Sequence, residues 1–267
     1  MIVVRILGGL GNQMFQYAYA RTLQNAGLKV KLDLSSFKNY KLHGGYQLDK
    51  YHINIQSAKN TTLLFCKLNP FKAVKEKSLI FTDALLSLRG NEYVKGYFQT
   101  EKYFEEIRNT LLTEFVINQK LSFNANHMAI LIKASKNSCS LHIRRGDYIS
   151  DKKANSVHGT CDLDYYKNAI DCINSSYLNV SFFVFSDDIS WTKENLSIEN
   201  AVYVDLKSMP HEDLYLMSLC AHNITANSSF SWWGAWLNQN KNKTIIAPKQ
   251  WFINKENEVA CKNWIKL

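Results

Sequence analysis

Apolar runs alternate with amphipathic stretches along most of the chain, and this pattern predicts a repeated order of strand and helix. The first apolar run, Ile2–Leu7, precedes a glycine-rich turn at residues 8–11 and then a stretch whose apolar residues recur at helical spacing. Gly27 is a typical helix stop, and a second strand is predicted over Lys29–Leu34. The chain therefore begins with a strand, a turn and a helix whose first N–H groups can receive an anion.

The second half of the chain carries the more regular pattern. Nearly every position of the strand predicted at Val180–Phe185 is apolar, which is typical of a parallel strand buried on both faces. Further strands are predicted at Ala201–Asp205 and Asn223–Ala226, and helices at Asp164–Ser175, Trp191–Leu196, His211–His222 and Trp232–Leu237. This alternation favours an α/β fold. The second series begins after residues 123–133, which predicts two domains, 1–128 and 129–267.

Two segments leave structural alternatives open. Residues 59–89 mix lysines with apolar residues, so they predict either a helical insertion with solvated lysines, which we favour, or a basic membrane-facing surface. Trp232, Trp233 and Trp236 can stack on a sugar or a base, but a helix that follows a buried strand more often uses large aromatic residues as core. We therefore predict these tryptophans to be core residues.

Two adjacent arginines, Arg144 and Arg145, follow an apolar run that ends at Ile143. Side chains alternate along an extended segment, so His142 and Arg144 are predicted on one face and Ile143 and Arg145 on the other. An arginine pair suits a diphosphate, because each guanidinium can bind two oxygens. One arginine is expected to meet the ligand and the other to pair with a carboxylate such as Asp147; the alternative is a surface ion-pair patch.

Polar residues follow two other predicted strands. Carboxylates stand after the strand at 180–185, and a segment rich in hydroxyls and amides opens the helix near Trp232, where it suits phosphate or serves as an ordinary helix cap. An open α/β sheet binds its ligand at such strand ends. The candidate binding residues at these two places are Asp187, Asp188, Asn227, Ser228, Ser229 and Phe230.

The N-terminal turn resembles a dinucleotide-binding fingerprint only in part. Met14 stands where the third glycine of that fingerprint is needed. The amides that follow the turn suit recognition of hydroxyl and phosphate groups at least as well. Candidate binding residues in this turn are Gly9, Gly11, Asn12 and Gln13.

Composition and net charge indicate which compartment and which kinds of ligand suit this chain. The 267 residues are 46% hydrophobic and include six cysteines with no CxxC pair, which predicts reduced packing residues in a cytoplasmic protein. We see no metal-ligand spacing, leader segment or apolar run long enough to span a bilayer. The net charge of +9 suits anionic ligands and peripheral contact with the inner membrane face, and it does not require nucleic acid as a partner.

Four motifs, in order and spanning nearly the whole chain, carry a family resemblance: GGLGNQMFQYA, HIRRGDY, FSDDISW and LMSLCAHNITANSSFSWWGAWL. Together they resemble glycosyltransferase family 11, the α-1,2-fucosyltransferases. The resemblance implies inverting transfer of L-fucose from GDP-fucose to the 2-hydroxyl of a galactose-terminated glycan that can be lipid-linked, as in surface polysaccharide or O-antigen synthesis. It also implies that no metal or other cofactor is needed.

The resemblance further implies a GT-B-like α/β fold, with two Rossmann-like domains facing across a cleft. Residues 1–128 would form the acceptor side and residues 129–267 the GDP-fucose-binding domain. Arg144 and Arg145, with the turn at 228–230, would surround the diphosphate. His142 and one of Asp187 and Asp188 would read the guanine, and the sequence leaves open which aspartate does so.

Other interpretations remain open from the residues alone. One is a nicotinamide-dependent oxidoreductase that uses the N-terminal turn, and another is a non-catalytic glycan-binding protein. Asp147 lies in the right loop to act as a general base for the acceptor, but it is equally suited to orienting an arginine. The sequence therefore identifies no general base.

Overall fold

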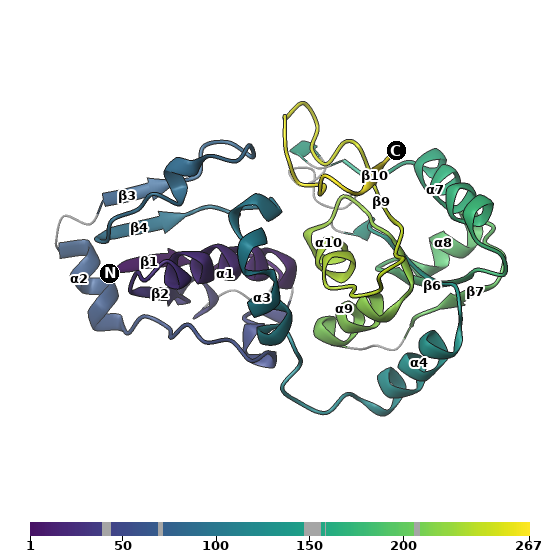
Figure 1. Cartoon of the computed structure of the whole chain (residues 1–267), viewed down its shortest axis with the longest axis horizontal. Helices are drawn as coiled ribbons and strands as arrows, with labels where there is room; N and C mark the ends of the chain where they lie inside the picture. Colours follow the sequence, from purple (N-terminus) through teal and green to yellow (C-terminus); the bar gives the residue numbers. More distant parts are fainter. Residues whose placement is uncertain (39–43, 69–71, 147–155, 158, 206–208) are drawn as a thin grey trace. The chain divides into compact units, whose positions relative to one another are not determined.

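The chain folds into two compact α/β units in a computed structural model, which describes residues 1–38, 44–68, 72–146, 156–157, 159–205 and 209–267 (Figure 1). Met1–Gln119 and Glu256–Val259 form the N-terminal unit, and Lys120–Lys255 and Ala260–Leu267 form the C-terminal unit. The sequence predicts the division after residue 128. In the structure the C-terminal unit already begins at Lys120, because helix α4 (Phe123–Ala134) lies in that unit. Each unit contains one parallel sheet, which confirms the predicted pair of Rossmann-like domains.

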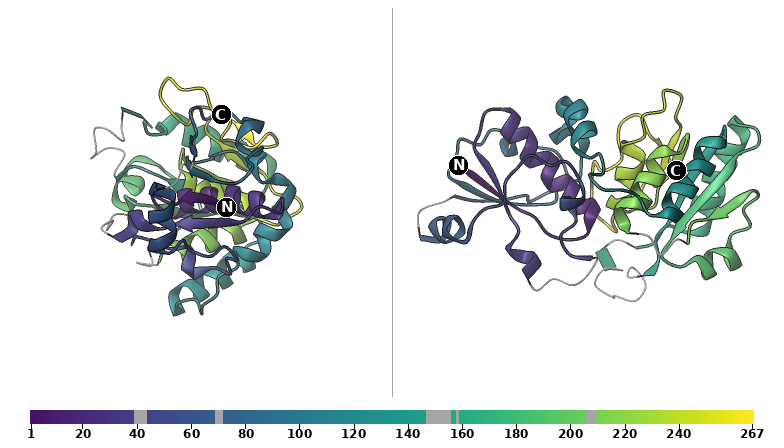
Figure 2. Two further views of the ribbon diagram at one scale, coloured as in Figure 1. Left: turned by 90° about the vertical axis from the view of Figure 1, so that its left-hand side faces the viewer. Right: turned by 90° about the horizontal axis from the view of Figure 1, so that it is seen from below.

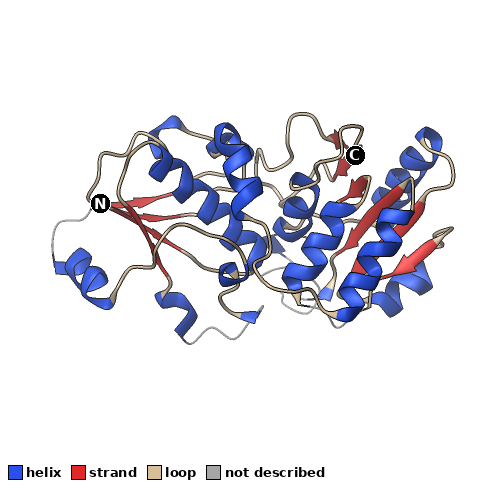
Figure 3. Ribbon diagram, turned by 60° about the horizontal axis from the view of Figure 1, so that its bottom comes forward, coloured by secondary structure: helices blue, strands red, loops and turns tan. Residues whose placement is uncertain are grey.

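The N-terminal unit is built on four parallel strands in the order β2-β1-β4-β3. Helix α1 lies along one face of this sheet and α2 lies on the other, as the views in Figures 2 and 3 agree. The strands are β1 (Ile2–Arg5), β2 (Val30–Asp33), β3 (Lys72–Lys75) and β4 (Glu92–Lys95), and the helices are α1 (Leu10–Asn25), α2 (Asn60–Leu68) and α3 (Arg108–Glu114). Short 3-10 turns occupy Ser35–Lys38, Leu48–Lys50, Asp83–Leu85, Glu101–Tyr103 and Glu105–Ile107.

The region predicted as a helical insertion, residues 59–89, is α-helical only in its first part among the residues that the structure describes. Helix α2 confirms that part of the prediction. The next described segment forms β3, which pairs in parallel with β4 and so joins the sheet. Val74 is half-buried and the other three side chains are exposed, so the segment lacks the apolar pattern by which a buried strand is recognised.

Helix α1 is buried on nearly every side, and its polar side chains are therefore bonded internally. The amide of Gln16 accepts a hydrogen bond from the Leu7 N–H at 2.9 Å and donates one to the Gly96 carbonyl at 3.0 Å. The turn before the helix requires Gly8, whose φ is +83° and whose position leaves no room for a Cβ beside the Asn12 amide. These contacts fix the turn between β1 and α1.

The C-terminal unit is built on six parallel strands in the order β10-β9-β8-β5-β6-β7. The strands are β5 (Ser138–Ile143), β6 (Ser181–Ser186), β7 (Ala201–Tyr203), β8 (His222–Ile224), β9 (Ile245–Ala247) and β10 (Ile265–Lys266). The helices besides α4 are α7 (Leu163–Ser176), α8 (Ile189–Asn195), α9 (Pro210–Leu219) and α10 (Ser229–Trp236).

Helices cover both faces of this sheet, and the alternation of β6 shows why its sequence is apolar throughout. Phe182 and Val184 pack with α7, whereas Phe183 and Phe185 pack with α4 and α9. Both faces of the central strands are thereby removed from water. The prediction of a doubly covered parallel sheet is confirmed.

The predicted role of the tryptophans is also confirmed. Trp232 and Trp233 are fully buried and Trp236 is 2% exposed, so all three are core residues. All six cysteines are free thiols. In the parts of the chain that the structure describes, no helix has the length and apolar character needed to cross a membrane.

Candidate functional site

The carboxyl ends of β8, β5 and β6 meet at one edge of the C-terminal sheet. These three strands are adjacent and parallel, with Leu141 of β5 opposite Ile224 of β8, and Ile143 opposite Ser186 of β6. Open α/β sheets bind ligands at this edge. The three polar segments that the sequence singled out each follow one of these strands, so the fold brings them together.

Asp187 holds the residues that follow β5, 144–146, which we call the arginine loop. Its Oδ2 lies 3.0 Å from Nη1 of Arg144, and its Oδ1 accepts a hydrogen bond from the Arg145 N–H at 2.9 Å. A side chain at Gly146 would meet this carboxylate, because a Cβ there would lie 2.9 Å from Oδ2. The Arg144 and Asp187 side chains are 26% and 24% exposed, so the pair is shielded but still accessible to a ligand.

Arg145 is held by an aromatic ring. Its Cζ lies 3.5 Å from the ring centroid of Trp191 in α8, and its Nε is buried with no hydrogen-bond partner. Stacking occupies the flat face of a guanidinium and leaves the N–H groups in its plane for an oxyanion. Trp191 is a residue that the sequence assigned only to a helix, and its proximity to Arg145 follows from the β5–β6 pairing.

Arg145 and His142 lie on opposite sides of the sheet, as alternation predicts. Ile143 and the Trp191 ring that holds Arg145 belong to the core beneath α7 and α8. The ring of His142 instead lies 5.8 Å from the ring of Phe230, which packs against the core of α4 and α9. Arg144 pairs with Asp187 and Arg145 stacks on Trp191, so the two arginines have different environments.

His142 is a buried, neutral imidazole. It is 5% exposed, and burial, followed by the charge of Arg144, lowers its pKa to about 3. Its Nδ1 has no hydrogen-bond partner. A buried polar atom without a partner is costly, so this ring is suited to a ligand that supplies one.

The free energy of unfolding is expected to fall with acid more steeply in the parent protein than in a His142→Gln variant. The unfolded imidazole takes up a proton near its ordinary pKa of 6.5, whereas the folded one stays neutral down to about 3. Stability is therefore lost as pH falls through this window, by about 2 kcal/mol between pH 6.5 and pH 5. Urea unfolding at pH 7 and pH 5 measures the difference, and an equal loss in the two proteins would contradict it.

Asp188 differs from its neighbour because its carboxylate caps α8. Its Oδ1 accepts a hydrogen bond from the Trp191 N–H at 3.1 Å, and its own N–H donates to Oγ of Ser186 at 3.0 Å. Asp187 thus faces the arginine loop, and Asp188 begins the helix. The sequence alone gave no basis for separating the two.

The segment before α10 is buried and bonded within the unit. Ser228 is the N-cap residue, and its Oγ accepts a hydrogen bond from the Phe230 N–H at 3.3 Å. The Asn227 amide accepts from Sγ of Cys161 at 3.6 Å and donates to the Gly159 carbonyl at 3.2 Å. Helix α10 itself begins at Ser229, so its first turn opens at the same edge as the arginine loop.

The candidate residues of the N-terminal turn belong to the other unit. Gly9 is the N-cap of α1, and Gly11 is buried in its first turn. Nε2 of Gln13 donates to the carbonyls of Gly8 and Gly45 at 2.9 and 2.8 Å, and Oε1 accepts from the Gln47 N–H at 2.9 Å. This bonded amide fills the turn, which weighs against a dinucleotide site there.

Three further points concern the remaining predicted residues. Asn12 is only partly buried, and its Oδ1 accepts a hydrogen bond from Nε2 of Gln99 at 2.8 Å. Asp147 lies outside the described residues. Among the residues that the structure describes, no group of three or more His, Cys, Asp or Glu side chains is placed to hold a metal ion.

Comparisons with known proteins match all or most of the chain to glycosyltransferases. The family model of Glycosyl transferase family 11 matches residues 1–267. An alpha-1,2-colitosyltransferase of Escherichia coli is 38% identical, over 96% of this chain and 94% of that protein. The O-antigen biosynthesis glycosyltransferase WbnK of Escherichia coli is 32% identical, over 97% of this chain and 98% of that protein. The galactoside 2-alpha-L-fucosyltransferase Sec1 of Mus musculus is 22% identical, over 89% of this chain and 64% of that protein.

Proposed function

Because this chain belongs to glycosyltransferase family 11, we propose that it transfers L-fucose from GDP-fucose to the 2-hydroxyl of a galactose-terminated glycan, with inversion at the anomeric carbon. The observation that carries this proposal is the arginine loop at the carboxyl edge of the C-terminal sheet. Arg144 and Arg145 are held there by Asp187 and Trp191, beside the first turn of α10. Such an edge suits a nucleotide diphosphate.

The chemistry required of the site is stabilisation of a departing diphosphate. In a single displacement the acceptor oxygen bonds to the anomeric carbon as the bond from that carbon to the β-phosphate oxygen breaks. The bonding electron pair leaves with GDP, and the proton of the acceptor hydroxyl passes to solvent. Negative charge builds on the β-phosphate, so donors fixed in advance stabilise the transition state more than the ground state. Arg144 and Arg145 supply planar donors that are held before the ligand arrives.

The nucleoside end of the donor is assigned to the same edge. His142 offers an unpartnered Nδ1, and Phe230 offers an aromatic ring beside it. Guanine presents two adjacent N–H donors, which a carboxylate accepts well, and Asp187 and Asp188 follow the neighbouring strand. Asn227, Ser228 and Ser229 complete the edge and direct the first turn of α10 toward phosphate.

A second candidate donor follows from the relatives. The names of the two Escherichia coli proteins state alpha-1,2-colitosyl transfer and O-antigen biosynthesis, and both proteins are more similar to this chain than the mouse fucosyltransferase is. Colitose is fucose without its 3-hydroxyl. GDP-colitose is therefore the alternative donor, and an O-antigen unit is the proposed acceptor in either case.

The experiment that tests this function compares two donors with one galactose-terminated acceptor. We expect turnover of GDP-fucose, with a kcat/KM above that of GDP-colitose, and we expect turnover to persist in EDTA because the arginines supply the neutralising charge. A site that hydrogen-bonds a hydroxyl rejects the analogue without it by roughly ten-thousandfold, whereas an apolar pocket discriminates weakly. Preference for GDP-colitose would replace the donor assignment, and no turnover with either donor would refute glycosyl transfer to this acceptor.

A further inference from the structure

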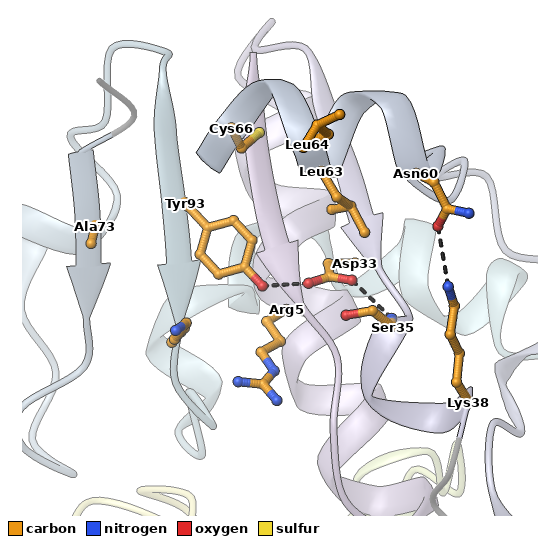
Figure 4. A pocket seen from close by; sticks show the side chains of 11 residues that line it. Arg5, Asp33, Ser35, Lys38, Asn60, Leu63, Leu64, Cys66, Ala73 and Tyr93 are labelled. Atoms are coloured by element: carbon orange, nitrogen blue, oxygen red, sulfur yellow. Dashed lines mark hydrogen bonds between the residues drawn. The ribbon is translucent and has the colours of Figure 1, made fainter. Parts of the chain in front are cut away.

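A cavity of about 620 Å³ lies in the N-terminal unit between α2 and the sheet face that α1 does not cover (Figure 4). Its size falls in the range of small-molecule sites. Arg5, Asp33 and Tyr93 line it from three adjacent strands, and Leu63 and Leu64 line it from α2. None of these side chains belongs to the edge described above, which lies in the C-terminal unit.

The sheet face that lines this cavity is charged, which is unusual for a parallel sheet. Val4 is fully buried and pairs with Leu32 and Val94, which share its face. The next residues, Arg5 and its partner Asp33, point to the opposite face, toward the cavity. Parallel sheets covered by helices are normally apolar on both faces. The polar face therefore indicates something other than packing.

Asp33 forms no ion pair with Arg5, although the two residues are partners across β1 and β2. Oδ2 of Asp33 accepts a hydrogen bond from the Tyr93 hydroxyl, and Oδ1 accepts one from the Ser35 N–H at 2.8 Å, as Figure 4 shows. Burial raises the pKa of Tyr93, and the bond to Asp33 raises it further, so this hydroxyl keeps its proton and remains a donor. The carboxylate is thus occupied by two other donors.

The guanidinium of Arg5 is left without a partner of its own. Its Nε is buried and has no hydrogen-bond partner, and no ion pair links it to another described residue. Figure 4 shows it in the cavity, beside the bond between Tyr93 and Asp33. A buried donor on a permanent cation is costly unless an acceptor reaches it.

The remaining charges of the cavity are also positive. Lys38 and Lys95 line it and are both exposed, Lys38 beside the Asn60 amide and Lys95 over the Tyr93 ring. Three cations thus face one carboxylate that is already bonded. The cavity has an excess of positive charge and a set of donors, which is the chemistry of an oxyanion site.

We propose that this cavity binds an oxyanion of the glycan acceptor, with Arg5 as its principal ligand. This inference rests on the proposed function, since it assigns the ligand to the acceptor. The oxyanion has two chemical sources: the carboxylate of an acidic sugar, or the diphosphate that joins a glycan to a carrier lipid. Ser35 and Asn60 offer polar groups for sugar hydroxyls, and Leu63 and Leu64 offer apolar surface to the carbon side of a ring or chain.

The test is calorimetric binding to the whole chain with GDP present at saturation, so that the donor edge is already occupied. Three probes are compared: methyl glucuronide, which carries a carboxylate; a sugar joined through a diphosphate to a farnesyl chain; and neutral methyl glucoside. We expect at least one charged probe to bind ten times more tightly than the glucoside, and the charged probe that binds identifies the source. Equal binding of all three probes, or no binding, would overturn the proposal without any variant.

Two variants locate the site. Arg5→Met keeps an unbranched apolar stem but removes the charged guanidinium, and it is expected to weaken binding of the charged probe about tenfold while GDP binding stays unchanged. Arg89→Met removes an exposed arginine of the same unit outside the cavity and is expected to have no effect. If Arg5→Met does not fold, Lys95→Met replaces it. Charged-probe binding that neither cavity variant weakens would overturn the assignment.

The experiments distinguish a failure of the proposed function from a failure of the cavity assignment. Charged-probe binding that depends on Arg5, in a protein that turns over neither donor, leaves the cavity assignment as an anion site and refutes fucosyl transfer. Turnover of GDP-fucose together with no preference for charged probes refutes only the acceptor subsite.

Discussion

Replacement of Arg144 with alanine is expected to lower kcat with GDP-fucose by about a hundredfold, while KM for the donor changes less. The variant loses a charge-assisted contact to the departing diphosphate worth about 3 kcal/mol in the transition state. Arg144 is favoured over Arg145 for this role because alternation predicts it on the side of His142 and because its guanidinium is oriented by Asp187. Initial rates at varied donor concentration measure the two constants.

The controls separate charge, geometry and folding. Arg144→Lys keeps the charge without the planar fork, so we expect its kcat to lie between those of the parent and the alanine variant. Arg145→Ala tests the second arginine, whose stacking on Trp191 is lost with it. Thermal melting shows whether each variant is folded. If both alanine variants are folded and turn over donor at near the parental rate, the arginine loop is not the diphosphate site.

The C-terminal unit was predictable because its central strands have a simple pattern. Both faces of β6 are buried, so Phe182–Phe185 is an apolar run of the kind typical of a covered parallel strand. The polar residues after β5, β6 and β8 then had to share an edge, since adjacent parallel strands end together. The positions of His142 and Arg145 on opposite faces followed from alternation alone.

The rest of the site needed the structure. Asp187 and Asp188 are adjacent and chemically identical, and only the start of α8 decides that one faces Arg144 and the other caps a helix. Trp191 reaches Arg145 from a different strand–helix unit, so no local pattern links them. Contacts of this kind depend on the register of β5 against β6, which sequence periodicity does not fix.

The N-terminal unit was harder to predict for a related reason. Strand β4 has Tyr93 and Lys95 on one face and a fully buried Val94 on the other, and β3 is mostly exposed. Neither segment shows the apolar run that marks β6. In β4 the polar residues that interrupt the apolar pattern, Tyr93 and Lys95, also line the cavity beneath α2. The same feature therefore weakens the strand signal and supplies candidate binding groups.

Replacement of Asp187 with asparagine is expected to weaken GDP binding by about 1.5–3 kcal/mol, or roughly ten- to hundredfold in Kd. The variant loses the ionic partner of Arg144, so the arginine loop is no longer held for the diphosphate. Because this effect acts on the phosphates, IDP, which lacks the 2-amino group of guanine, should be weakened equally. Calorimetry with GDP and IDP measures both affinities.

Asp188→Asn is the matched control, because asparagine is as good an N-cap as aspartate and α8 keeps its first hydrogen bond. We expect Asp188 to read the guanine, since its Oδ1 bonds only the Trp191 N–H whereas both oxygens of Asp187 serve the arginine loop. Asp188→Asn should therefore lose the preference for GDP over IDP that the parent protein shows, while its affinity for IDP stays at the parental value. Loss of that preference in Asp187→Asn instead would exchange the two roles. Parental affinities in both variants would mean that the guanine is read elsewhere and that the loop needs no carboxylate to hold it.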